Sequence, residues 1–294
     1  MALFIATYTP NIKVGIANYL KVVFSCYRIN SLVHKDLNFK CIDKNFKHIY
    51  SSIFKNNEMI LYDTENKIYE NHSLNETYPY FKNIYILLQK NDKKVYKVDG
   101  WRFYIHPNDT VNIHPFANEW FLRNCSMSID LRFNNIPKNI QEMYIDIINK
   151  FEIDDKIIKN VNSFVTENIN EDFLGVHIRT WFNNNTLHDN RSSNERYNHY
   201  LSVRDDFIHN INKASQKSVL ICTDNKKEIQ YITDKIVNKK VIFYIEDPTC
   251  NYIQNDFSEL LLLSKSSYLI GSVNSTFTEL AWWYSKCSIM VTIL

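Results

Sequence analysis

Hydrophobic positions in the first half of the chain predict one helix followed by a series of strands. The run "LFIATYT" reads as a strand, and after a loop apolar residues recur at helical spacing from about Gly15. These helix residues are Ile16, Tyr19, Leu20, Val23 and Tyr27. Strand-like runs follow at "KHIYSSIF", "EMILYD", "NIYILLQ" and "KKVYKVDGWRFYI".

In the second half, strands and helices alternate. The segment 135–170 has helical periodicity, with an apolar face made of Ile140, Tyr144, Ile147, Ile148 and Phe151. Then come strand "FLGVHIRT", a polar stretch, a helix over 197–213, strand "SVLICTD", a helix over 226–235, strand "VIFYI", helix "DFSELLLLSKS" and strand "YLIGS". This order predicts a parallel, doubly wound sheet whose ligands lie beyond the carboxyl ends of its strands.

The length of 294 residues suits two domains, which we predict as residues 1–165 and 166–294. No internal repeat and no linker rich in proline or glycine marks the boundary near residue 165.

Composition narrows the class of protein. Hydrophobic residues make up 45% of the chain, enough for packed cores, and the formal net charge of +2 gives no reason to expect a nucleic acid or an anionic membrane as partner. No segment reaches the roughly 18 apolar residues of a membrane span. The six cysteines lie far apart without metal-ligand spacing, so we expect reduced, mostly buried thiols in a soluble, cytosolic protein.

Because the chain has only four glycines, each is expected to satisfy a backbone need such as positive φ or close approach. Gly15 opens "GIANYL" at a predicted strand-to-helix turn, where backbone N–H groups can hold a phosphate or simply start a helix. Asn18 lies in the first turn of this helix, either as a local cap or as a ligand contact.

Two predicted strands end in polar side chains. In "GVHIRT", His177 and Arg179 share one face of the strand, and arginine has a fork of donors suited to a pyrophosphate. The alternatives are a core histidine and a structural salt bridge. In "SVLICTDN" the strand ends at Thr223 and Asp224, where a carboxylate can accept hydrogen bonds from a base or ribose, or can cap the next helix.

The stretch "GSVNSTFTELAWW" predicts a second anion site. Strand "YLIGS" ends at Gly271, and Ser275 and Thr276 begin a helix, which brings hydroxyls and N–H groups to one point. Trp282 and Trp283 are expected in the core rather than as a sugar platform. Since the chain contains no Asp-x-Asp pair, we expect no metal, and Arg179 and helix dipoles would take the place of a cation.

In this order the motifs resemble the fucosyltransferase superfamily of α1,2- and α1,6-fucosyltransferases and protein O-fucosyltransferases, over nearly the whole chain. "GIANYLKVVFSCYRI" is similar to the Gly-x-Gly-Asn-x-Leu loop and helix, with Ala17 in place of the second glycine. "VDGWRFYI" resembles a Gly-Tyr-x-Gln segment, "GVHIRT" the His-x-Arg motif and "ICTDN" the Ser/Thr-Asp strand end. "DFSELLLLSKSSYLIGSVNSTFTELAWW" resembles the carboxyl-terminal block with its Asn-Ser-Ser-Phe-Ser core.

The resemblance implies an α/β, GT-B-like fold in which two Rossmann-like domains face each other across a cleft. It implies inverting, metal-independent transfer without a cofactor, with GDP-fucose held by the carboxyl-terminal domain and much of the glycan acceptor by the amino-terminal one.

The same resemblance implies a role for each matching residue. Arg179 would neutralise the β-phosphate, His177 would hold the nucleotide, and Asp224 would touch the guanosine end beside Thr223. Asn18 would reach the pyrophosphate from the amino-terminal domain, next to Gly15. The phosphate-side wall would comprise Ser275, Thr276 and Phe277, and Asn274 would also bind the substrate.

The chain departs from the family pattern after the histidine motif. An Arg-Arg-x-Asp segment is usual there, whereas Arg179 is followed by "TWFN". A general base for the acceptor hydroxyl could be Asp189, Glu195 or His188 in the polar loop, and we expect Asp189 because the α1,6 family's candidate base lies a similar distance after its motif. An ordinary solvated loop is the alternative, and some relatives act without a side-chain base.

Two other functions remain open at this point. The fold could use another nucleotide sugar, such as a rhamnose or xylose donor, or it could bind glycans without catalysis.

Overall fold

The computed structural model comprises two compact units. The first comprises residues 1–126 with 136–154, and the second residues 127–135 with 155–294. Within them the structure describes residues 3–7, 15–17, 19–20, 23–24, 27, 38–42, 49–55, 60–61, 72–73, 84–89, 93–99, 138–169, 171–180, 193–273 and 275–294. The boundary predicted near residue 165 falls inside helix α6, which this division assigns to the second unit.

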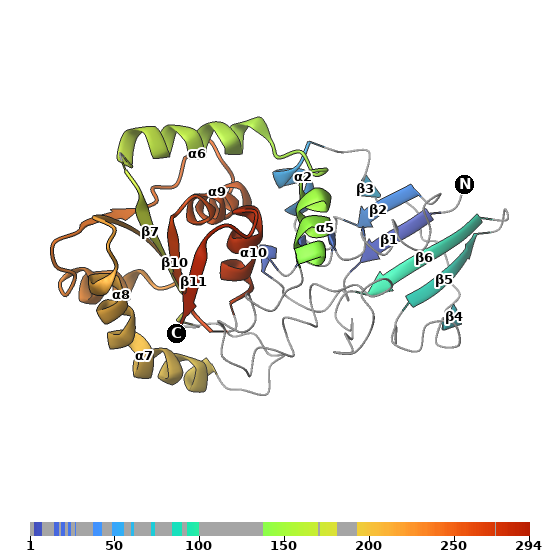
Figure 1. Ribbon diagram of the computed structural model, residues 1–294. Helices are drawn as coiled ribbons and strands as arrows, with labels where there is room; N and C mark the ends of the chain where they lie inside the picture. The colour runs from blue at the N-terminus through green and yellow to red at the C-terminus, as the bar shows by residue number, and fades with distance from the viewer. Residues whose placement is uncertain are drawn as a thin grey trace. The chain divides into compact units, whose positions relative to one another are not determined.

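The first unit contains a mixed sheet with the strand order β3-β2-β1-β6-β5-β4 (Figure 1). Its strands are β1 (Leu3–Thr7), β2 (Asn38–Ile42), β3 (Ile60–Leu61), β4 (His72–Ser73), β5 (Ile84–Gln89) and β6 (Lys93–Asp99). β1 pairs in parallel with β2 and β6, whereas β5 pairs antiparallel with both β4 and β6. The link between β5 and β6 is too short for a crossover, so these strands can only be antiparallel.

One predicted strand of this unit is a helix. The segment "KHIYSSIF" forms α2 (Ile49–Ile53), and helix α5 (Lys138–Ile148) belongs to the same unit. Ile49, Tyr50 and Ile53 are all buried, a spacing that fits one helical face. The ring of Tyr50 packs at a tilt on that of Phe54, with centroids 5.1 Å apart. The β-branched and aromatic residues of this segment favour a strand, so we attribute its helical conformation to tertiary packing.

The second unit carries a wholly parallel sheet with the order β11-β10-β7-β8-β9. Its strands are β7 (Phe173–Ile178), β8 (Ser218–Thr223), β9 (Lys240–Phe243), β10 (Tyr268–Gly271) and β11 (Met290–Ile293). Its helices are α6 (Asp155–Asn168), α7 (Ser193–Lys213), α8 (Lys226–Thr233), α9 (Tyr252–Ser264) and α10 (Thr276–Tyr284). The predicted alternation of strands and helices is confirmed here.

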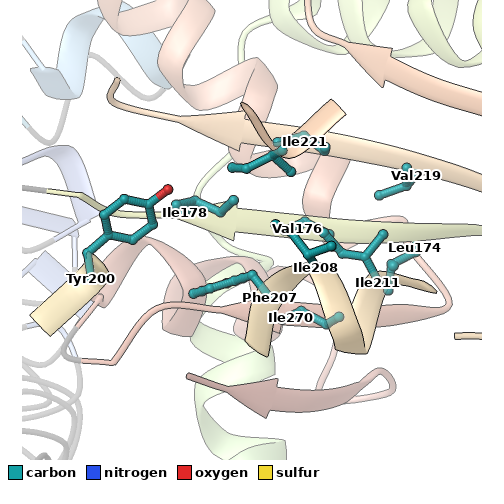
Figure 2. Packing of buried hydrophobic residues seen from close by; sticks show 11 residues of the cluster. Leu174, Val176, Ile178, Tyr200, Phe207, Ile208, Ile211, Val219, Ile221 and Ile270 are labelled. Carbon is teal, nitrogen blue, oxygen red and sulfur yellow. The ribbon is translucent and has the colours of Figure 1, made fainter. Parts of the chain in front are cut away.

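Helices cover both faces of this sheet. Every residue of β7 is buried, as expected for a strand between two helical layers. On one face α7 packs onto β7, β8 and β10 through Phe207, Ile208 and Ile211 (Figure 2). On the other face α9 contacts both α6 and α10. Trp282 and Trp283 are each 4% exposed, which confirms them as core residues.

Two bulk expectations hold for the described part of the chain. Cys222 and Cys250 are buried reduced thiols, and Cys287 is a half-buried one. Among the residues that the structure describes, none of the helices combines the length and apolar character needed to cross a membrane.

Candidate functional site

The strand order of the second unit creates a topological switch point between β7 and β10. The chain runs outward from β7 to β8 and β9, then returns through α9 to β10 on the other side of β7. The helices that follow β7 and β10 therefore lie on opposite faces, and the carboxyl ends of such neighbouring strands are where doubly wound proteins bind ligands. Gly271 pairs with His177, and Thr223 with Ile178, so three strands end side by side.

Two of the four glycines allow other segments to approach this sheet closely: the first helical turn of α10 at Gly271, and the loop between α9 and β10 at Gly175. A Cβ at Gly271 would lie 2.3 Å from Cγ2 of Thr278, and one at Gly175 would lie 2.8 Å from Oγ of Ser266. The expected backbone need is thus confirmed as close approach. The expectation of a backbone need is wrong for Gly15, because a Cβ added there would meet nothing within 4 Å. None of the glycines that the structure describes has positive φ.

His177 is a buried residue held by the first turn of α10. Its Nδ1 lies 2.9 Å from Oγ1 of Thr278 and 3.2 Å from Oγ of Ser275. Its ring stacks on Phe277, with centroids 4.9 Å apart. Burial, with a smaller contribution from the Arg179 charge, lowers the pKa of His177 to about 3. The imidazole is therefore neutral at neutral pH and acts through hydrogen bonds rather than as a cation.

Arg179 and Asp224 form an ion pair across the ends of β7 and β8. Nη1 of Arg179 lies 3.0 Å from Oδ2 of Asp224. Oδ1 of the same carboxylate accepts hydrogen bonds from the Thr180 N–H at 2.8 Å and the Thr180 hydroxyl at 2.9 Å. The carboxylate of Asp224 thus orients the guanidinium of Arg179.

The α8 cap lies one residue beyond Asp224. Asn225 accepts from the Lys227 N–H at 3.1 Å and caps the helix, so the alternative reading of Asp224 as the cap is wrong. Thr223 holds this turn, since its hydroxyl accepts from the Asn225 N–H at 3.2 Å.

The turn between β10 and α10 is bound to the end of β7. The Arg179 N–H donates to Oγ of Ser272 at 2.8 Å, and the Ser272 N–H donates to the His177 carbonyl at 3.1 Å. Ser275 is the N-cap and accepts from the Thr278 N–H at 3.4 Å. The N–H groups of Thr276 and the following residue begin this helix, where the helix itself offers no acceptor and the dipole favours an anion.

A carboxyl group that sequence analysis missed lies at the same edge of the sheet. Glu259 of α9 is half-buried and hydrogen-bonds with the thiol of Cys222 near the end of β8. Burial, with smaller contributions from Asp256 and Glu246, raises the pKa of Glu259 to about 7. In the sequence, Glu259 lies within the largely apolar predicted helix "DFSELLLLSKS". An acidic residue among these leucines is the one signal that could have identified it as a site residue.

Several predicted site residues cannot be placed. Asn18, Asp189 and Asn274 lie outside the described residues, as does His188. Glu195 is an exposed residue of the first turn of α7, and Gly15 is an exposed residue at the start of a helix in the first unit. Over the residues that are described, no cluster of three or more His, Cys, Asp or Glu side chains could hold a metal ion.

Comparison with known proteins gives a consistent picture at the level of fold. No protein-family model matches the chain, and no curated protein sequence does so significantly. Among solved structures, the fucosyltransferase NodZ from Bradyrhizobium is similar with a TM-score of 0.59 at 11% identity, over 98% of this chain and 94% of that one. POFUT1 in its apo form is similar with a TM-score of 0.51 at 11% identity, over 100% and 97% of the two chains.

Two further solved structures in this group hold a nucleotide or were exposed to one. The NodZ α-1,6-fucosyltransferase soaked with GDP-fucose has a TM-score of 0.57 at 10% identity, over 97% of this chain and 93% of that one. POFUT1 in complex with GDP has a TM-score of 0.50 at 11% identity, over 99% and 98% of the two chains. The resemblance that the motifs predicted is therefore confirmed as a fold: this chain has the α/β fold of the fucosyltransferases.

Proposed function

We propose that the chain is an inverting, metal-independent glycosyltransferase that moves fucose from GDP-fucose to a hydroxyl of a glycan acceptor. The observation that carries the proposal is the meeting of Arg179, neutral His177 and the N-terminus of α10 at the switch point of a fucosyltransferase-like fold. In the proposed enzyme the two units form a GT-B arrangement, with the nucleotide on the second unit and the acceptor on the first.

The diphosphate is assigned to Arg179 and the first turn of α10. A guanidinium has five N–H donors, so the contact with Asp224 through Nη1 still allows a forked contact with a phosphate. Ser275, Thr276 and Phe277 supply the wall on the other side, and the helix N-terminus favours the negative charge. Asn18 remains our proposed contact beside the pyrophosphate, and Asn274 a proposed substrate-binding residue.

The chemical step places charge on the leaving group. The acceptor oxygen attacks C1 of fucose, the bond from C1 to the β-phosphate oxygen breaks, and GDP leaves with the bonding electrons. Arg179 and the α10 dipole stabilise that developing charge in place of a metal. Asp189 is our proposed general base for the acceptor proton.

We assign the guanine to Glu259 rather than to Asp224. Both oxygens of Asp224 are engaged with Thr180 and Arg179, which ties this carboxylate to the fold. Glu259 lies at the same edge of the sheet, and a carboxylate can accept from the N1–H and the amino group of guanine together. His177 would hydrogen-bond the nucleotide through Nε2, since Nδ1 faces the hydroxyls of α10.

The test is turnover of GDP-fucose in EDTA, compared with UDP-, dTDP- and other GDP-sugars, for wild type and Arg179→Ala. We expect selective release of GDP by the wild type and its loss in the variant. Arg204→Gln changes an arginine of the same unit that pairs with Glu228 instead, so it should keep turnover. Selective use of another donor, or nucleotide-independent glycan binding, would contradict the proposal.

A further inference from the structure

Strand β9 ends beside the residue to which we assign the guanine. Ile221 of β8 pairs in parallel register with Phe243, the last residue of β9. The next residue of β8 is Cys222, whose thiol hydrogen-bonds with Glu259. Because neighbouring strands lie about 5 Å apart, the loop that leaves β9 starts directly beside this thiol and carboxyl pair.

One side chain of α9 holds the backbone of this loop in place. Oδ1 of Asn255 accepts hydrogen bonds from the Tyr244 hydroxyl at 2.7 Å and from the Asp247 N–H at 2.9 Å. The amide nitrogen of the same side chain donates to the Asp247 carbonyl at 3.1 Å. Asn255 is 5% exposed and lies one turn before Glu259 on the same face of α9. The loop is therefore fixed against the helical turn that precedes the proposed guanine ligand.

Ile245 is an apolar side chain that this loop presents to solvent. It is 78% exposed, the largest fraction among the exposed large hydrophobic side chains in the described part of the chain. Tyr244 on one side and Asp247 on the other are both bound to Asn255, so the backbone around Ile245 is held at the surface. A ligand that covers this side chain removes exposed apolar area from water, which favours binding.

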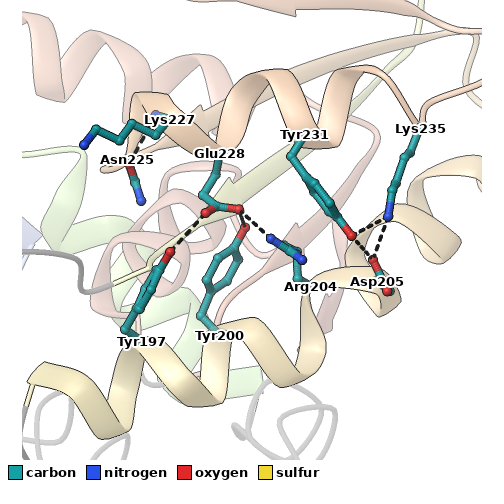
Figure 3. Close-up of polar contacts among 9 residues, drawn as sticks. All are labelled: Tyr197, Tyr200, Arg204, Asp205, Asn225, Lys227, Glu228, Tyr231 and Lys235. Atoms are coloured by element: carbon teal, nitrogen blue, oxygen red, sulfur yellow. Dashed lines mark hydrogen bonds and ion pairs between the residues drawn. The ribbon is translucent and has the colours of Figure 1, made fainter.

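Two polar side chains at the neighbouring start of α8 are engaged within the protein (Figure 3). Asn225 caps the helix. Glu228 is 8% exposed and accepts hydrogen bonds from the hydroxyls of Tyr197 and Tyr200, at 3.1 and 2.9 Å. These groups stabilise the corner between β8 and α8, whereas Ile245 is exposed at the end of the next strand.

We propose that Ile245 covers one face of the guanine ring, while Glu259 binds the edge of that ring. A purine has two apolar faces and a polar edge, so a carboxylate that accepts from the edge leaves both faces to be covered by other groups. An aliphatic side chain on a fixed loop beside the carboxylate suits one of these faces. Such a residue contributes to the affinity for the base and makes no contact with the phosphates. The inference rests on the proposed binding of GDP and adds a residue to the same site.

The test measures the affinities of guanosine, GMP and GDP by calorimetry in EDTA, for wild type, Ile245→Ala and Ile245→Val. We expect Ile245→Ala to weaken all three ligands by the same factor, about three- to ten-fold, because they share the base. The heat capacity change of binding should become less negative in this variant, since less apolar surface is buried. Ile245→Val keeps most of the apolar contact and should lose less than about two-fold. Because Ile245 is 78% exposed, both variants should keep the Tm of the wild type.

Val237→Ala is the matched control. Val237 is an aliphatic residue that is 57% exposed, but it precedes β9 and so lies at the amino end of that strand, away from the proposed site. Its substitution should leave all three affinities unchanged. Unchanged affinities in Ile245→Ala, or a loss of GDP affinity without an equal loss for GMP, would overturn the inference while the proposed function stands. A wild type that does not bind GDP would instead contradict the proposed function.

Discussion

The ion pair of Asp224 and Arg179 gives a prediction that separates an internal anchor from a ligand contact. Asp224→Asn keeps an oxygen that can accept from Thr180, but replaces the oxygen facing Arg179 with an amide donor. Asp224→Ala removes both sets of contacts. If the carboxylate is an anchor, these two substitutions must destabilise the folded protein to different extents.

The magnitudes follow from exposure and partners. Arg179 and Asp224 are 31% and 18% exposed, so the pair is partly screened, and we expect Asp224→Asn to cost about 1–3 kcal/mol of folding free energy. Asp224→Ala also leaves the N–H and hydroxyl of Thr180 without this acceptor, and Thr180 is 0% exposed. Unsatisfied buried donors cost about 1–3 kcal/mol each, so alanine should exceed asparagine by about 2 kcal/mol after some relaxation.

Urea unfolding of the two variants and of Arg179→Ala in both backgrounds measures these terms. We expect a coupling energy between Arg179→Ala and Asp224→Asn of about 1 kcal/mol or more, because the two side chains are in contact. Equal unfolding free energies for wild type and both Asp224 variants would refute the anchor, and would return this carboxylate to the ligand.

Three further predictions follow from the site. Gly271→Ala should lower the free energy of unfolding in urea by about 1–3 kcal/mol, because its Cβ would overlap Thr278. Gly15→Ala places its Cβ in open space and should change that free energy by less than about 1 kcal/mol. Equal effects of the two substitutions would contradict the close approach at Gly271. The pKa of His177 is about 3 in the folded protein and 6.5 in its unperturbed form, so between these pH values the unfolded state binds more protons, and the free energy of unfolding should fall as pH drops from 6.5 toward 3. Unfolding measured as a function of pH should show a flatter slope for His177→Gln. An unchanged slope would exclude a buried neutral imidazole. Because the pKa of Glu259 is about 7, calorimetry should show the affinity for GDP falling as pH drops below 7. Glu259→Gln should weaken GDP binding and remove this pH dependence. A variant with the affinity and pH profile of the wild type would exclude Glu259 as the guanine ligand.

The parallel half of the fold was predictable because its signals agree. Strand β7 is buried along its whole length, and Gly271 stands where helix α10 packs closely on the sheet. The first half was harder, because "KHIYSSIF" has strand-like composition and becomes a helix only through packing on aromatic neighbours such as Phe151. Strands β2 and β4 gave no pattern that we recognised.

The candidate site was predictable as a set of strand ends but not as a set of contacts. His177, Arg179 and Asp224 gather as their positions on parallel strands require. That Asp224 is bound to Arg179 and Thr180 depends on how β7 and β8 align, which local sequence does not specify. The contacts of Tyr197 and Tyr200 on α7 with Glu228 on α8 are also long-range, and periodicity cannot reveal them.

The most direct test of the account is calorimetric titration of GDP into the full chain in EDTA, with Arg179→Ala and with UDP as comparison. The account predicts saturable one-to-one binding of GDP by the wild type, much weaker binding of UDP, and a loss of about ten-fold or more in GDP affinity in Arg179→Ala. Absence of GDP binding, or equal affinity in the variant, would contradict the assignment of this switch point as a nucleotide-sugar site.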